Sequence, residues 1–156
     1  MMHMNPIRNE GRQLRGRARG MSLIEVLVSV LILSLGLLGI AALQSMALRG
    51  GQGSLESSQA VMAATSIVEN MRANSANAGS YNTAKVCSSA SIPGSDLASN
   101  NLRDWLNGLK GSIGTLGDTT TCAQITGCPN CAITVFWDDS RAGGASNRSL
   151  ALEATI

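Results

Sequence analysis

Four cysteines and one isolated glutamate are the residues of this chain whose type and spacing could support chemistry. Cys128 and Cys131 form a C-x-x-C pair, and Cys87 and Cys122 lie upstream of it. A C-x-x-C pair can exchange disulfides where its thiol pKa is lowered, typically in a βαβ setting. Here the pair precedes a predicted strand and no predicted helix follows it, so the sequence disfavours redox catalysis.

The other chemistries open to these side chains are metal binding and structural crosslinking. Zinc would need a second closely spaced cysteine pair, which the sequence lacks. Asp138 and Asp139 offer calcium two carboxylates, but calcium takes six or more oxygens. Structural disulfides are therefore the favoured interpretation, with Cys87 joining a loop to the sheet. Four cysteines allow three pairings, and the sequence does not choose among them.

The isolated glutamate, Glu25, is the only charged residue between Met21 and Leu48. This apolar segment is long enough to cross a bilayer as a helix. Five arginines precede it, Arg8, Arg12, Arg15, Arg17 and Arg19. Clustered arginines ahead of a membrane segment hold the N-terminus in the cytoplasm, so the rest of the chain is predicted on the far side.

The charge distribution argues against nucleic-acid binding. The 156-residue chain has a net charge of +2, but only seven basic and nine acidic residues follow Gly20. A nucleic-acid binder normally keeps its basic surface in the folded part. His3 lies in the basic leader, so no Ser-His-Asp set can be assembled. The sequence also offers no phosphate-binding loop and no carboxylate pair for acid–base catalysis. We expect no enzyme activity, cofactor or metal.

Three interpretations of the apolar segment compete. A secretory signal peptide cut near Ser45–Ala47 would have an apolar region of about 7–15 residues and no acid. A plain membrane anchor leaves Glu25 as a penalty of roughly 2.5–3.5 kcal/mol at the bilayer centre. Cleavage after Gly20 instead creates an α-amine on Met21, four residues before Glu25. A paired charge can fix the register between apolar helices, so this third interpretation explains the acid.

The residues that carry this interpretation, "RGMSLIEVLV", resemble the class III signal of type IV pilins. The resemblance implies that a prepilin peptidase cuts between Gly20 and Met21 and N-methylates Met21, which stands where Phe is more usual. Glu25 would dock the subunit in a filament. Further along, "LSLGLLGIAALQ" (33–44) and "ENMRAN" (69–74) are similar to minor pilins of the PilV type, also called type IV pilus modification proteins.

This resemblance implies a minor pilin that helps prime pilus assembly at the tip and supports twitching motility and adhesion. Its partners would be other minor pilins, the major pilin, the prepilin peptidase and the inner-membrane assembly platform. It would be a single-pass inner-membrane protein with a periplasmic body, extracellular once assembled. Two rivals remain, a type II secretion pseudopilin and a tip adhesin that binds through the loops 75–100 and 138–149.

The expected fold is α+β, a long N-terminal helix packed on a small antiparallel sheet. We divide the chain into a leader (1–20), a transmembrane or filament-core helix (21–53) and a pilin body (54–156). Gly50–Gly53 favours a bend, frayed turn or break, but the sequence does not decide between this and a continuous helix; beyond it, Ser54 can cap a helix that ends near Asn74. A loop over 75–95, a helix around 102–109 and strands near 119–125, 133–137 and 150–156 follow.

Overall fold

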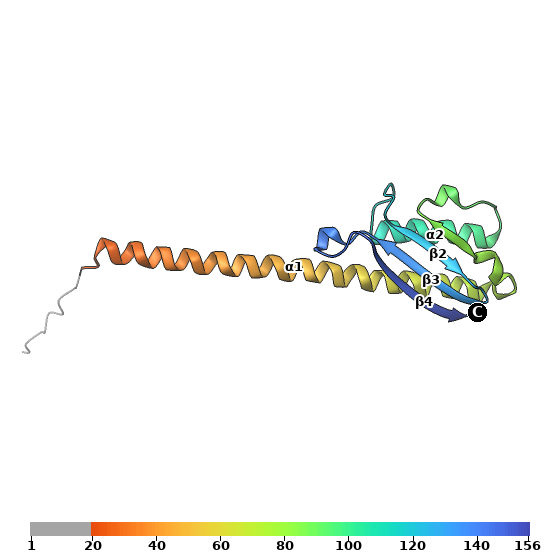
Figure 1. Cartoon of the computed structure of the whole chain (residues 1–156), viewed down its shortest axis with the longest axis horizontal. Coiled ribbons are helices and arrows are strands. Elements are labelled where there is room, and N and C mark those ends of the chain that lie inside the picture. The colour runs from red at the N-terminus through yellow and green to blue at the C-terminus, as the bar shows by residue number, and fades with distance from the viewer. Residues whose placement is uncertain (1–19) are drawn as a thin grey trace, which may run out of the picture. The chain divides into compact units, whose positions relative to one another are not determined.

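The computed structural model describes residues 20–156, and the predicted leader up to residue 19 lies outside this range. The chain divides into two compact units, Met1–Ala41 and Ala42–Ile156. Helix α1 (Leu23–Ala73) contributes to both of them (Figure 1). The second unit also holds a second helix and all the strands of the described chain.

Helix α1 runs without interruption through Gly50–Gly53, so the predicted break and the cap at Ser54 are wrong. Each helical glycine costs about 1 kcal/mol relative to alanine, but a helix that is already nucleated propagates through such a cost. Gly53 is buried, and a Cβ placed there would lie 3.3 Å from Asp139 Oδ1. The missing side chain lets the loop after the third strand pack directly on α1.

Four antiparallel strands form one sheet in the order β1-β2-β3-β4. They are β1 (Thr83–Val86), β2 (Cys122–Thr126), β3 (Asn130–Trp137) and β4 (Arg148–Thr155). Successive strands in this order are neighbours, and the register places Ile133 of β3 between Ile125 of β2 and Leu152 of β4. The strands expected near 119–125, 133–137 and 150–156 are therefore present, with shifted ends.

The core lies between one face of this sheet and the two helices. Ile133, Val135 and Trp137 alternate along β3 and are buried, because successive strand residues point to opposite faces. They pack in one cluster with buried residues of α1 and α2, including Ile67 and Leu106. The second unit is thus a helix layer on a sheet layer, which confirms the predicted α+β class.

Helix α2 (Leu97–Ser112) presents Leu102, Trp105, Leu106 and Leu109 to the core, the face predicted from its spacing. Its N-cap is Asp96, whose side chain accepts a hydrogen bond from the Ser99 N–H at 2.7 Å. This hydrogen bond is the main reason that the pKa of Asp96 is lowered.

Residues 75–95 are more ordered than the predicted loop. They contain the 3-10 helix η1 (Ser75–Tyr81), strand β1 and the 3-10 turn η2 (Ser89–Ser91). Tyr81 anchors the segment because it is fully buried and its hydroxyl accepts a hydrogen bond from Asn101 Nδ2 of α2 at 2.8 Å. A composition rich in Ser, Asn and Ala hid this order.

Candidate processing site and helix surface

The predicted processing site lies immediately before α1. Gly20, Met21 and Ser22 precede the helix, and Gly20 and Met21 are exposed. The Ser22 carbonyl accepts the first helical hydrogen bonds, from the Glu25 N–H at 3.0 Å and the Val26 N–H at 3.3 Å. The Gly20–Met21 peptide bond is therefore outside the helix.

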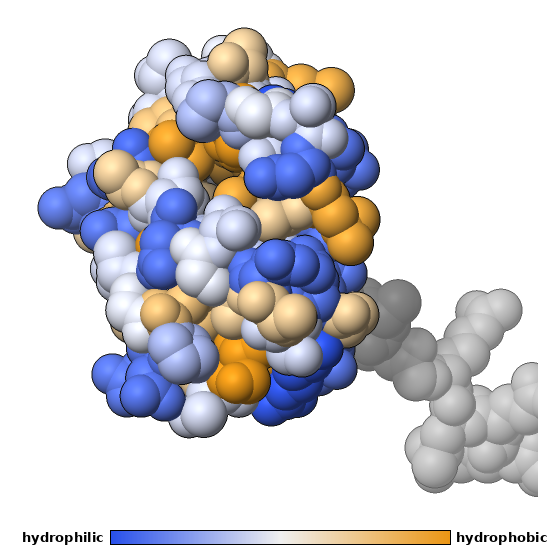
Figure 2. Space-filling model, turned by 90° about the vertical axis from the view of Figure 1, so that its right-hand side faces the viewer, coloured by the Kyte–Doolittle hydropathy of each residue, from blue (hydrophilic) through white to orange (hydrophobic). Residues whose placement is uncertain are grey.

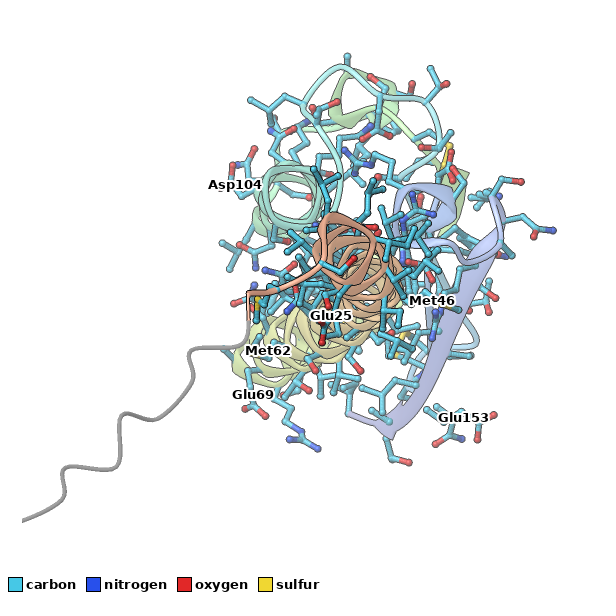
Figure 3. All side chains as sticks on the ribbon, turned by 90° about the vertical axis from the view of Figure 1, so that its left-hand side faces the viewer. Glu25, Met46, Met62, Glu69, Asp104 and Glu153 are labelled. Carbon is cyan, nitrogen blue, oxygen red and sulfur yellow. A yellow bond between two sulfur atoms is a disulfide. The ribbon has the colours of Figure 1, made fainter. Side chains whose placement is uncertain are left out.

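Glu25 is an exposed carboxylate in the first turn of α1. Figure 3 labels it in the view from the N-terminal end of the molecule. A carboxylate at this position interacts favourably with the partial positive charge of a helix N-terminus. Within its own chain Glu25 has no ion-pair partner among the described residues.

The helix surface beyond Glu25 is apolar on all sides. Every large hydrophobic side chain from Met21 to Leu48 is exposed, from 48% at Val26 to 80% at Leu23. By length and composition, α1 is long enough and apolar enough to cross a membrane. Soluble monomers rarely expose apolar patches larger than a few hundred Å². This surface requires lipid or other apolar helices around it.

The surface of the second unit is different. The face in Figure 2 is largely hydrophilic, with hydrophobic residues in scattered spots. A groove between α1 and α2 is lined mainly by amide, hydroxyl and apolar groups, among them Met62, Asn70 and Asn101. Asp104 is the one ionisable side chain in this lining (Met62 and Asp104 are labelled in Figure 3). The groove therefore contains no acid–base pair.

The four cysteines form two disulfides, Cys87–Cys122 and Cys128–Cys131. The first joins the end of β1 to the start of β2, and the second closes the turn before β3. With all four sulfur atoms in disulfides, none is a thiolate for zinc. Among residues 20–156, no group of three or more His, Cys, Asp and Glu side chains is placed to hold a metal.

The two aspartates considered for calcium have other partners. Asp138 Oδ1 accepts a hydrogen bond from the Ser140 N–H at 2.9 Å. Its pKa is lowered, chiefly by its hydrogen bonds with Ser140. Asp139 is buried and forms an ion pair with Arg148. The Asp138 carboxylate therefore acts within the loop after β3, whereas the Asp139 carboxylate joins this loop to β4.

Sequence reasoning missed a buried ionic cluster that closes the loop between α2 and β2. Lys110 is buried, and its Nζ lies 3.6 Å from Asp118 Oδ1. The same carboxylate accepts hydrogen bonds from the N–H groups of Thr115, Thr120 and Thr121. Burial acts to raise the pKa of Asp118, but the hydrogen bonds and Lys110 together lower it to about 2. The feature of the sequence that could have indicated this cluster was a single aspartate, Asp118, in a loop rich in Gly and Thr.

Residues 15–41 match the family model of the prokaryotic N-terminal methylation motif. No curated protein and no solved structure matches the chain. The motif spans the Gly20–Met21 bond, Glu25 and most of the exposed apolar helix. Together with the α+β fold, it supports a type IV pilin-like or pseudopilin subunit, a structural class that assembles with other pilins after processing by prepilin peptidase.

Proposed function

We propose that this protein is a minor pilin of the PilV type that helps prime assembly of a type IV pilus at its tip. The observation that carries the proposal is an exposed apolar helix that begins with the methylation motif and bears one carboxylate in its first turn. The resemblance of residues 33–44 and 69–74 to PilV-type proteins supports this kind of subunit. Twitching motility and adhesion then follow from the filament.

Processing is the first step of the proposed mechanism. The leader holds the N-terminus in the cytoplasm, and α1 inserts across the inner membrane with the body in the periplasm. Prepilin peptidase cuts the accessible Gly20–Met21 bond and methylates the new amine. The cut removes the arginines that fixed the orientation and leaves Met21 as a cation four residues before Glu25.

Lateral packing of apolar helices drives the second step. Leaving the bilayer for a bundle of similar helices keeps the side chains of Leu23–Leu48 away from water. Apolar contact is non-directional, so it does not by itself set the register between subunits. A carboxylate in an apolar bundle is strongly unfavourable without a partner. Glu25 therefore selects the one register in which it meets the amine of a neighbouring Met21.

An experiment in the cell that encodes the protein distinguishes a role in the pilus from a role in protein secretion. Surface filaments are sheared off, and both filaments and membranes are searched by mass spectrometry for peptides of this chain. We expect the mature protein in filaments, in smaller amounts than the major pilin, and fewer filaments when the gene is deleted. Mature protein confined to membranes, with normal piliation and impaired protein secretion, would instead identify a pseudopilin.

A pair of variants tests the role of the carboxylate. Glu25→Ala should fail to restore filament number in the deletion strain, although the protein is still made and inserted. Glu69→Ala is the matched control, because it removes an exposed carboxylate from the same helix, and should restore filaments (both residues are labelled in Figure 3). Equal restoration by both variants would contradict docking through Glu25.

A further inference from the structure

A buried polar group lies where the loop after β3 meets α1. Asp139 is only 1% exposed. A Cβ added at Gly53 of α1 would lie 3.3 Å from its Oδ1, and a Cβ added at Gly144 would overlap its Oδ2. The Asp139 carboxylate is thus enclosed between α1 and its own loop. It fits there because Gly53 and Gly144 have no side chains.

Most of the hydrogen-bonding capacity of Asp139 is used to hold the loop. Its N–H donates to the Ala145 carbonyl at 3.0 Å, and its carbonyl accepts from the N–H groups of Ala142 and Gly144 at 3.0 and 2.9 Å. Its Oδ2 pairs with Arg148 of β4. Oδ1, by contrast, is buried and has no hydrogen-bond partner.

A second unpartnered oxygen faces the same space. Glu56 is three residues after Gly53 on α1, less than one helical turn from the glycine that contacts Asp139, and the charge of Asp139 acts on its carboxyl group. Its Oε2 is also buried without a partner. The indole N–H of Trp137 is buried and has no hydrogen-bond partner either. Two buried carboxylate oxygens this close would repel each other if both groups were ionised.

We infer that Glu56 and Asp139 share one proton, and that this proton latches the loop 138–147 onto α1. A single O–H···O⁻ hydrogen bond gives a partner to both buried oxygens at once. In this arrangement the Glu56 hydroxyl donates to Asp139 Oδ1, and the other carboxylate oxygen of Asp139 keeps its ion pair with Arg148. Charge-assisted hydrogen bonds of this kind are among the stronger ones in proteins.

The electrostatics at Glu56 agree with this assignment. Burial raises its pKa above the ordinary value of 4.5, and the negative charge of Asp139 raises it further. Arg141 and Trp137 act in the opposite direction. The pKa of Glu56 is above 4.5 when the loop is closed. The hydrogen bond from Glu56 to Asp139 is therefore fully formed below pH 4.5 and is lost as the pH rises through this raised pKa.

The test is amide hydrogen exchange on the full-length chain in detergent micelles between about pH 4 and pH 8. Protection factors at Ala142 and Gly144, each corrected for the intrinsic exchange rate, report the loop. We expect them to fall with rising pH, by about tenfold for each unit by which the pKa of Glu56 in the closed loop exceeds that in the open loop. Constant protection would overturn the proposal.

Glu56→Gln should abolish this pH dependence, because its amide donates to Asp139 at every pH. Glu153→Gln is the matched control, since it changes an exposed carboxylate of β4 (Figure 3), and should leave the dependence as in the wild type. Carboxyl-carbon NMR of the wild type gives an independent readout of Glu56. A midpoint at or below 4.5 would overturn the proposal even if the variant failed to fold.

Discussion

The two disulfides should differ in the stability they confer, because they close loops of different length. Cys87 and Cys122 are 35 residues apart in sequence, whereas Cys128 and Cys131 are 3 apart. In the chain-entropy description, a crosslink stabilises the fold by restricting the unfolded chain, and more so for a longer loop. That relation gives about 4 kcal/mol for the long bridge and about 2 kcal/mol for the short one.

Two variants separate these contributions. Cys128→Ala with Cys131→Ala keeps the long bridge, and Cys87→Ala with Cys122→Ala keeps the short one. Each is unfolded by guanidinium in detergent micelles, oxidised and reduced, with tryptophan fluorescence as the signal. Since the oxidised and reduced forms have the same side chains, their difference in the free energy of unfolding isolates the crosslink. Losses of stability from the alanines cancel.

We expect reduction to cost the variant with the long bridge about 2 kcal/mol more than the variant with the short bridge. The tryptophans report the right region, because Trp105 and Trp137 both lie in the core of the second unit. A short bridge that contributed as much as the long one would refute the reasoning. No effect of reduction on the long-bridge variant would show that Cys87 and Cys122 are not bonded.

Three further predictions concern local interactions. Asp118→Ala should destabilise the fold by about 2–3 kcal/mol in chemical unfolding, because three backbone N–H groups lose their acceptor and buried Lys110 loses its ion-pair partner. Because the folded-state pKa of Asp118 is lowered from 3.8 to about 2, this stabilisation is present above pH 3.8, declines towards pH 2 and should be missing from the variant. Gly51→Ala should stabilise α1 by about 1 kcal/mol and so slow its amide exchange. Gly53→Ala should stabilise α1 less, because the added Cβ contacts Asp139. Equal stabilisation by both variants would contradict tight packing at Gly53. Asp96→Ala should lower the free energy of unfolding, because the Ser99 N–H loses its acceptor, and no loss would mean that the cap of α2 contributes nothing.

The sequence predicted the elements whose apolar period is clear. Ile133, Val135 and Trp137 alternate with polar or partly exposed residues, and this period identified β3. Strand β1 was missed because it has only four residues, and its two central ones, Ala84 and Lys85, are exposed. No alternation remains to be recognised in so short an edge strand. Its place is set by pairing with β2.

The disulfide pairing was beyond the sequence because it depends on strand register. Val86 pairs with Ala123, so Cys87 and Cys122 fall opposite each other at the end of the same ladder. The continuity of α1 through Gly50–Gly53 has a similar cause. Local propensity disfavours helix there, whereas the contact of Gly53 with the loop carrying Asp139 depends on tertiary packing.

The candidate site divides in the same way. Gly20, Met21 and Glu25 were identified from sequence, because the motif and the apolar period are local properties of the chain. Their cleavage and docking remain proposals, since docking depends on a neighbouring subunit. The sequence did not reveal that Glu56 lies near Asp139, because this proximity arises only when the loop after β3 packs on α1.

The most direct test of the account is the N-terminal mass of the protein after coexpression with a prepilin peptidase. Intact-mass and peptide spectrometry of the purified chain would show where it begins. We predict a chain that starts at Met21 with one methyl group on its amine, and an uncut chain when the peptidase is inactive. A chain that starts after Ala47, or that stays uncut with active peptidase, would contradict it.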